Sequence, residues 1–441
     1  MPDSTDKRIL ELALPNIITN ITVPLLGVVD LMIVGHIGDQ LFIGAIAIGT
    51  MIFNFIYWNF GFLRMGTSGL TAQAYGARQL HEAVSVLVRG VVLALLISLT
   101  LIVFQYPIGK FALWLIDGNS QMEYLAYQYF KIRIWAAPAT LGMYVIKGWF
   151  ICMQNAKTPM TVAIVINVLN ILFSLLFVMV FDMQIEGVAL GTLLAQWSGL
   201  LISVLLWMKY YKKLAKHIHI AQSMNWQEMK LFFRINSDIF LRSLCLVAVF
   251  SFLPVAGAKM GDEILAVNTL LLQYFTIFSY IMDGFAYAGE SLTGKYIGSG
   301  EYKVLKRTVR HLFYWGVALS ALFTIVYAFG GDVLLRAFTD KQNIIAASHP
   351  YYFWVLMVPF AGFAAFLWDG IYIGATASKE MRDCMFIATI LFFGIYYGLI
   401  NFMGNNALWL ALIVFLLLRG VLQYIYARKA VYAKALLKGN Y

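Results

Sequence analysis

Residues 9–34 read ILELALPNIITNITVPLLGVVDLMIV, an apolar stretch whose ionisable side chains are Glu11 near its start and Asp30 near its end. It exceeds the roughly 20 residues that a helix needs to cross a bilayer. An ionised Asp at the middle of a bilayer costs about 2.5–3.5 kcal/mol, so such residues usually face a cavity and serve a function. A carboxyl group that alternates between ionised and neutral forms is a natural proton acceptor. Asp30 is therefore the first candidate functional residue.

The whole chain has the composition of a membrane protein. It is 61% hydrophobic and 12% charged, with a mean hydropathy of +0.77, whereas soluble domains are about 45–50% apolar and about 25% charged. About twelve stretches are long enough to span a bilayer, at 9–34, 42–62, 84–106, 124–149, 159–181, 187–208, 236–258, 263–288, 308–330, 349–373, 384–403 and 407–427. We therefore expect an all-α polytopic membrane protein.

The net charge of +10 is explained by the sidedness of the basic residues. If the N-terminus is cytoplasmic, most Lys and Arg fall in the segments on the same side, including the linker near 209–234 and the C-terminal tail. The positive-inside rule then places both termini in the cytoplasm of a cell with this protein in its inner membrane. Binding of the 209–216 cluster to nucleic acid or acidic lipid is a less favoured alternative.

The second half of the chain repeats the first at a nearly constant spacing. Gly38-Asp39 matches Gly261-Asp262, Gly61-Phe62 matches Gly284-Phe285, and Pro138 matches Pro359. Six spans per repeat give both halves the same orientation, as in transporters whose lobes are related by an axis along the membrane normal. We expect an N-terminal six-helix lobe (1–208), a cytoplasmic basic linker (209–234) and a C-terminal six-helix lobe (235–441).

A catalytic site is not expected. Residues 289–295, G-E-S-L-T-G-K, come close to a phosphate-binding loop, but Tyr296 stands where Ser or Thr would hold magnesium, and no strand precedes the segment. The six His are dispersed, and no zinc-spaced His pair or Gly-x-Ser-x-Gly elbow occurs. The protein is thus predicted not to be an enzyme and to need no cofactor, so that an ion gradient is the remaining energy source.

Polar residues of the first half fall on single helix faces at 100° per residue. These are Asn16, Asn20 and Asp30 on the first span, Asn167, Asn170 and Ser174 on the fifth, and Thr192 and Gln196 on the sixth. Helix packing alone is the competing explanation, with about even weight for the sixth span. A site of Asp30, Asn170, Ser174 and Thr192 could hold a proton or a sodium ion. Its single carboxylate favours the proton.

A second charge pattern comes from the repeat. Arg64 and Lys147 in the first half, and Asp283 and Asp369 in the second, lie at similar depths toward the cytoplasmic ends of their spans. We expect them to pair across the cytoplasmic mouth as a reversible gate, with pairing within one lobe as an equally weighted alternative. Glu290, which follows Asp283 on the same helix, is expected to cap this region with Lys295.

Several motifs resemble one transporter family. GFLRMGTSGLTAQAYGA (61–77) and VDLMIVGHIG (29–38) resemble signatures of the multidrug and toxic compound extrusion (MATE) family, and FLWDGIYIGATASK (366–379) resembles its DinF-like subgroup. The resemblance covers essentially the whole chain. It implies twelve helices in two six-helix lobes, and export of organic cations and amphiphilic compounds driven by inward proton or sodium flow.

The resemblance also implies site residues. The first-span Asp of the family falls on Asp30, the fifth-span Asn on Asn170 and a sixth-span Thr on Thr192. This chain departs at Ser174, where relatives often carry a second Asp. Without that carboxylate a sodium site at Asp30, Asn170 and Thr192 is weakened, and no other metal site is expected.

The sequence therefore predicts a monomeric, proton-coupled antiporter that works by alternating access in the lipid bilayer, takes cationic or amphiphilic small molecules and binds no nucleic acid. Pro15 and Pro24 provide places where the first helix can bend. The alternatives are a sodium-coupled multidrug exporter and a lipid-linked oligosaccharide flippase. A flippase cavity would need Arg to hold a pyrophosphate, and Arg64 and Arg89 are the obvious candidates in the first lobe.

Overall fold

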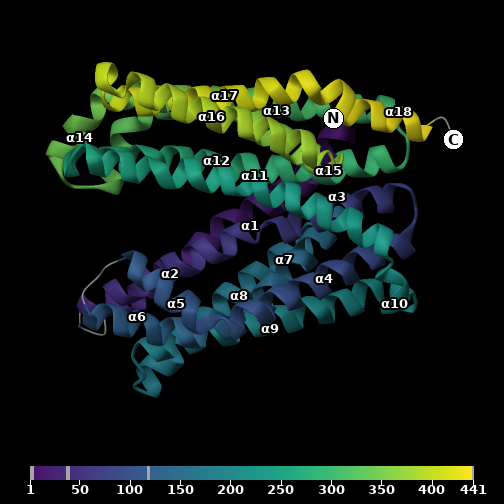
Figure 1. Ribbon diagram of the computed structural model, residues 1–441, viewed down its shortest axis with the longest axis horizontal. Helices are drawn as coiled ribbons and strands as arrows, with labels where there is room; N and C mark the ends of the chain where they lie inside the picture. The colour runs from purple at the N-terminus through teal and green to yellow at the C-terminus, as the bar shows by residue number, and fades with distance from the viewer. Residues whose placement is uncertain (1–3, 36–39, 117–119, 440–441) are drawn as a thin grey trace. The chain divides into compact units, whose positions relative to one another are not determined.

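The computed structural model describes residues 4–35, 40–116 and 120–439, and every regular element in this part is helical (Figure 1). Within these ranges some side chains lie outside the described part, namely those of Val23, Leu25, Leu26, Val28, Val29, Asp30, Leu31, Val34, Gln40, Leu115, Ile116, Lys438 and Gly439. The backbone of Asp30 thus belongs to helix α1 (Ser4–Gly35), while its side chain is not described.

Packing divides the chain into two compact units. The N-terminal unit holds Ile18–Ala74 and Gln79–Phe232, and the C-terminal unit holds Met1–Ile17, Tyr75–Arg78 and Phe233–Tyr441. These boundaries differ from the expected lobes in two ways. The first half of α1 packs in the C-terminal unit, and nearly all of the basic linker packs in the N-terminal unit.

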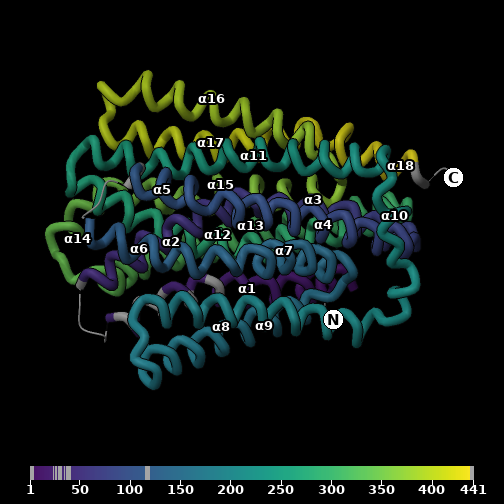
Figure 2. Tube along the Cα trace, turned by 60° about the horizontal axis from the view of Figure 1, so that its bottom comes forward, coloured from purple at the N-terminus to yellow at the C-terminus, as the bar shows by residue number. Residues whose placement is uncertain are grey.

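The N-terminal unit contains the second half of α1 and a set of helices of unequal length. Within this unit the most extensive helix–helix contacts are between α8 and α9, between α4 and α7, and between α2 and α6. The first two pairs run side by side in Figure 2. The elements are α2 (Gln40–Asn59), α3 (Phe62–Gly76), α4 (Leu80–Val103), α5 (Gln105–Ile116), α6 (Ser120–Arg133), η1 (Ile134–Ala136), α7 (Ala137–Cys152), α8 (Lys157–Leu175), the π-helical turn η2 (Leu176–Val180), α9 (Ile185–Tyr211), η3 (Lys212–His217) and α10 (Ile220–Ser223).

The C-terminal unit is built around α15, which packs against α12, α13 and α17. Small residues permit this approach: a Cβ atom added at Gly370 would overlap the backbone carbonyl of Ala286. The elements are α11 (Trp226–Lys259), α12 (Asp262–Gly298), α13 (Tyr302–Phe338), α14 (Gln342–Ser348), η4 (His349–Tyr351), α15 (Tyr352–Gly374), α16 (Ser378–Met403), α17 (Asn405–Ala427), η5 (Arg428–Tyr432) and α18 (Ala433–Gly439).

Polar contacts explain why the start of α1 packs in the C-terminal unit. Asp6 Oδ1 accepts a hydrogen bond from Trp315 Nε1 at 3.1 Å and pairs with His311 Nδ1 at 2.9 Å, both on α13. Arg8 donates to the hydroxyl of Tyr296 on α12 at 3.0 Å. Contacts between residues so distant in sequence leave no periodic signal. The expected division of the chain into lobes therefore did not take them into account.

The helices have the dimensions of membrane spans. Ten helical stretches of the described residues are long and apolar enough to cross a bilayer. They fall on ten of the expected spans, and the other two expected spans fall on α1 and on α6 with α7. The prediction of an all-α polytopic membrane protein is therefore confirmed.

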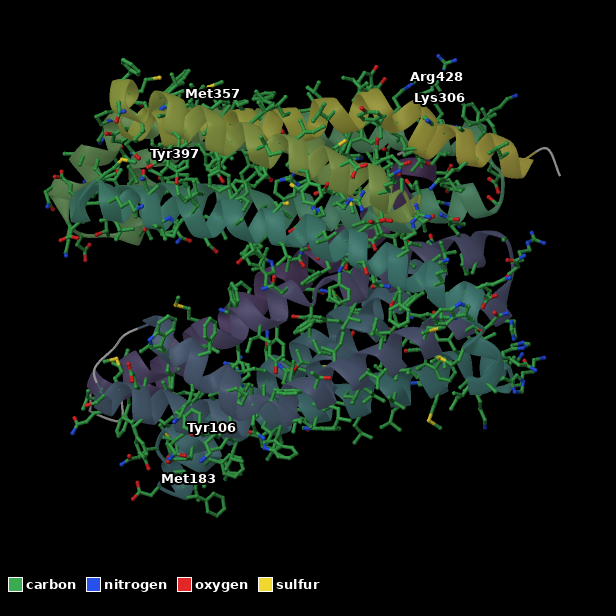
Figure 3. All side chains as sticks on the ribbon, in the orientation of Figure 1. Tyr106, Met183, Lys306, Met357, Tyr397 and Arg428 are labelled. Carbon is green, nitrogen blue, oxygen red and sulfur yellow. The ribbon has the colours of Figure 1, made fainter. Side chains whose placement is uncertain are left out.

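Two exposed basic residues of the C-terminal unit lie near the C-terminus. Lys306 on α13 and Arg428 on η5, both exposed, lie near the C-terminus, whereas Met357 and Tyr397 lie toward the opposite end (Figure 3). The cytoplasmic placement of this end, expected from the positive-inside rule, stays a prediction.

Candidate functional site

Three of the expected site residues come together where α8 meets α9. Asn170 Nδ2 donates a hydrogen bond of 2.9 Å to Thr192 Oγ1, and Thr192 Oγ1 donates to the backbone carbonyl of Val188 at 3.1 Å. Asn170 and Ser174 are fully buried, and Thr192 is 1% exposed. We call Asn170, Ser174 and Thr192 the amide–hydroxyl cluster.

A glycine brings the two helices of this cluster into contact. A Cβ atom added at Gly191 would overlap Ser174, both at its hydroxyl and at its backbone N and Cα. α9 therefore lies directly against the backbone of α8 at this level. The helix packing that the sequence left open for the sixth span is therefore present, beside the polar residues.

Two buried oxygen atoms of the amide–hydroxyl cluster could each accept a further hydrogen bond. Among the described residues, neither Asn170 Oδ1 nor Ser174 Oγ has a hydrogen-bond partner, although both atoms are buried. Leaving a buried polar atom without a partner costs about 1–3 kcal/mol. A group outside the described set, such as a side chain, an ion or water, is needed to complete the cluster.

Helix α1 reaches the same region of the N-terminal unit. Asn167 Nδ2 on α8 donates a hydrogen bond of 2.7 Å to the backbone carbonyl of Thr22 on α1. Asp30 lies about two turns beyond Thr22, and Ser174 about two turns beyond Asn167. The side chain of Asp30 is outside the described residues, so its expected contacts with the amide–hydroxyl cluster stay a prediction.

The remaining expected cavity residues of the first lobe are dispersed. Asn16 is fully buried and donates to the carbonyl of Leu12 at 2.8 Å, within the part of α1 that packs in the C-terminal unit. Asn20 on α1 and Gln196 on α9 are half-buried in the N-terminal unit. The expected stripe on the first span is thus divided between the two units.

The second buried polar group lies inside the C-terminal unit. Asp369 on α15 forms ion pairs with Arg242 on α11 and with Arg419 on α17, the latter at 2.5 Å. Gln423 Nε2, also on α17, donates to Asp369 Oδ1 at 2.8 Å. All four residues are buried, and we call them the ion-pair cluster.

Asp369 thus has ion-pair partners in its own unit, which is the alternative that the sequence left open.

The other residues expected at the gate have the following positions. Arg64 is 6% exposed and Glu290 is fully buried. Lys147 and Asp283 are half-buried, and Asp283 lies close enough to Arg419 to act on it electrostatically. Pairing of Lys147 with Asp369 across the lobes stays a prediction. The expected capping contact of Glu290 with Lys295 also stays a prediction.

Arg242 and Arg419 were not among the residues predicted from the sequence. The signal was available, because an Arg within an apolar span is costly and marks either a buried partner or a functional site. What the sequence could not supply was the adjacency of α11, α15 and α17, which identifies the partner.

The segment that resembled a phosphate-binding loop has a different structure. Residues 289–295 lie inside α12, and all but Lys295 are buried. A phosphate-binding loop presents backbone N–H groups that are not used by a helix. The helical hydrogen bonds of α12 use those groups, so a nucleotide site is not supported here.

Comparisons with known proteins agree with this fold. The sequence profile of the MatE family matches the chain twice, at residues 15–176 and 239–400, in accordance with the internal repeat. The DNA damage-inducible protein F of Escherichia coli is 36% identical over 418 residues, which cover 95% of this chain and 91% of that protein. A probable multidrug resistance protein NorM of Bradyrhizobium diazoefficiens is 23% identical over 371 residues, 82% of this chain and 78% of that protein.

Solved structures show the same fold at lower sequence identity. A MATE structure in the bent conformation superposes with a TM-score of 0.86 at 18% identity, covering 98% of this chain and 96% of that one. An outward-facing multidrug resistance MATE transporter superposes with a TM-score of 0.84 at 18% identity, covering 98% and 97%. The expected MATE-like architecture is confirmed. The chain belongs to the multidrug and toxic compound extrusion family, whose members are membrane transporters and not enzymes.

Proposed function

We propose that this transporter is a secondary active antiporter that exports organic cations or amphiphilic compounds in exchange for protons. The observation that carries the proposal is the pair of buried acceptors, Asn170 Oδ1 and Ser174 Oγ, without a partner among the described residues. They lie on the helix that contacts α1, the helix that contains Asp30. A protonated carboxyl group is a donor and would satisfy one acceptor.

The register of α1 against α8 supports this assignment. The first and fifth spans of a lobe cross the membrane in the same direction, and Asn167 bonds to the backbone of Thr22. Asp30 and Ser174 are each about two turns beyond that contact. We therefore infer that Asp30 lies at the level of the amide–hydroxyl cluster.

The proposed cycle follows from the two states of one carboxyl group. In the outward-facing state Asp30 accepts a proton, which removes a counter-charge for a cationic substrate and releases it. Return to the inward-facing state with loss of the proton restores the substrate site. If one proton exchanges for one monovalent cation, the pH gradient alone drives transport, at about 1.4 kcal/mol per pH unit.

Sodium coupling is the second candidate, with Asp30, Asn170 and Thr192 as ligands. Oxygen ligands are available, since Asn170 Oδ1 has no partner among the described residues. Ser174 contributes a neutral hydroxyl in place of a carboxylate. A site with a single negative charge favours a proton over a sodium ion, because the bare ion must replace a full hydration shell.

A lipid-linked oligosaccharide flippase is less well supported. Such a protein needs Arg side chains that are available for a pyrophosphate. Arg89 is 2% exposed and pairs with Glu82 at 2.7 Å and with Glu228. Its guanidinium group is therefore already neutralised by two carboxylates of the N-terminal unit.

Purified protein in liposomes distinguishes these candidates. Efflux of a fluorescent organic cation after a pH jump at equal sodium on both sides is the expected result. Efflux driven by a sodium gradient at fixed pH would favour the sodium-coupled alternative. Translocation of a labelled lipid-linked oligosaccharide without cation efflux would overturn the proposal.

We also infer that the protein acts as a monomer in the inner membrane of the cell, with both termini cytoplasmic. The exposed basic residues near the C-terminus support this orientation (Figure 3). Protease treatment of sealed inverted vesicles should remove a C-terminal tag, whereas right-side-out vesicles should protect it. The reverse pattern would contradict the orientation.

A further inference from the structure

The segment that follows α9 carries the densest group of exposed basic residues in the N-terminal unit. It runs over η3 and α10 to the start of α11, residues 209–232, and has Glu228 as its single acidic residue. Its five lysines are all exposed, namely Lys209, Lys212, Lys213, Lys216 and Lys230.

One side of this segment is fixed to α4. Arg89 Nε donates a hydrogen bond of 2.6 Å to the backbone carbonyl of Ser223, and Ser223 Oγ donates to Ser85 Oγ at 3.1 Å. The imidazole rings of His217 and His81 also meet edge to face at 5.8 Å. The segment is therefore a defined surface of the N-terminal unit and not a freely hanging loop.

The acidic side chains nearest to the segment are partly exposed, Glu82 to 33% and Glu228 to 44%, but both are held in ion pairs. Glu228 pairs with Arg89, and so does Glu82 of α4. The positive charge of Arg89 is thus balanced by these two carboxylates, which are the nearest to the segment. The lysines on the outer side have no acidic partner within the segment.

Apolar side chains stand between these lysines. Ile218 is 43% exposed, Ile220 is 63% exposed and Trp226 is 76% exposed. A mixture of exposed Lys, Trp and aliphatic side chains is typical of segments that lie at a membrane surface. We define the exposed side of residues 209–230, with the five lysines and these three residues, as the linker face.

We propose that the linker face binds the surface of anionic phospholipids in the membrane that the protein spans. The charge is complementary to the phosphate groups, and polybasic segments next to a membrane span are attracted to an anionic leaflet. The segment continues directly from α9, a candidate span, so it begins at the level of the headgroups. The apolar side chains add burial that a soluble polyanion such as nucleic acid does not offer.

A label at one position of the linker face tests this binding without measuring transport. Cys152, Cys245 and Cys384 are replaced by Ala, and Ile220→Cys carries an environment-sensitive fluorophore. The protein is reconstituted in liposomes of phosphatidylcholine with increasing phosphatidylglycerol. The emission should shift to shorter wavelength as the anionic fraction rises, and high salt should reverse the shift by screening.

Two variants in the labelled background decide the outcome. The first variant should abolish the shift. It combines four substitutions in the linker face, namely Lys209→Gln, Lys212→Gln, Lys213→Gln and Lys216→Gln. The matched control neutralises four exposed basic residues of the C-terminal unit, Lys303→Gln, Lys306→Gln, Arg428→Gln and Lys429→Gln, and should keep it.

The proposal is overturned if the linker variant shifts like the labelled parent, or if the control variant loses the shift equally. It is also overturned if soluble glycerol phosphate added to neutral liposomes gives the same shift, because the face would then bind a free anion. None of these readouts depends on the coupling ion or the substrate.

Discussion

The amide–hydroxyl cluster in the N-terminal unit and the ion-pair cluster in the C-terminal unit place polar atoms in a similar apolar setting. In the first, Asn170 Oδ1 and Ser174 Oγ have no partner among the described residues. In the second, Asp369 receives bonds from Arg242, Arg419 and Gln423. Two oxygen atoms of the first cluster lack a donor among the described residues, whereas the carboxylate of the second is already neutralised.

This difference assigns different roles to the two units. A group that exchanges protons or ions during each cycle must lose its partners without a large cost, which the open cluster permits. A buried ion pair resists such exchange, because removing one partner leaves an uncompensated charge. Under the proposed function, coupling belongs to the N-terminal unit, whereas the ion-pair cluster cross-links α11, α15 and α17.

The largest effect is expected at the ion-pair cluster. Asp369→Ala leaves two buried guanidinium groups without their carboxylate and should lower the free energy of unfolding by about 3–5 kcal/mol. Thermal unfolding in detergent measures this. Ser174→Ala is the matched variant in the other cluster and should cost less than about 1 kcal/mol, because its hydroxyl makes no described hydrogen bond. Equal losses would remove the distinction between the clusters.

Close packing at the amide–hydroxyl cluster gives the next effect. Gly191→Ala places a methyl group against the backbone of Ser174 and should cost about 1–3 kcal/mol. Gly394→Ala on α16 is the control, because a Cβ atom there meets nothing within 4 Å. The control should be neutral or slightly stabilising, as Ala favours helix over Gly. A neutral Gly191→Ala would show that α8 and α9 are further apart than described.

The hydrogen bond between α8 and α9 should contribute less. Thr192→Val removes the acceptor of Asn170 Nδ2 and keeps the shape of the side chain, so a loss of about 1 kcal/mol is expected. The same variant should reduce pH-driven efflux, because Asn170 is then free to turn away from the site. Unchanged efflux at equal protein levels would exclude Asn170 orientation as a determinant of coupling.

The smallest expected shift is the response of the thermal midpoint to sodium in Ser174→Asp, which adds a carboxylate beside Asn170. In this variant the thermal midpoint should rise with sodium concentration, since an ion that binds the folded state stabilises it. The parent protein should show no such rise at constant ionic strength. A sodium-dependent rise already present in the parent would favour the sodium-coupled alternative.

Much of the fold could be predicted from the sequence, because membrane spans are continuous apolar runs. Residue spacing also placed Asn170 and Thr192 on polar faces of the fifth and sixth spans, and the structure joins them by a hydrogen bond. The partners of Asp369 could not be predicted, since repeat alignment relates positions but does not say which helices touch. The division of α1 between the units was missed for the same reason: the contacts of Asp6 are with α13, far along the chain.

The most direct test of the account is proton release on substrate binding. A cationic substrate is added to purified protein in weakly buffered detergent solution, and the pH is followed. The account predicts that the parent protein releases protons and that Asp30→Asn releases none, while Asp369→Asn, compared at equal folded protein, still does. Undiminished release from Asp30→Asn would contradict the assignment of coupling to the N-terminal unit.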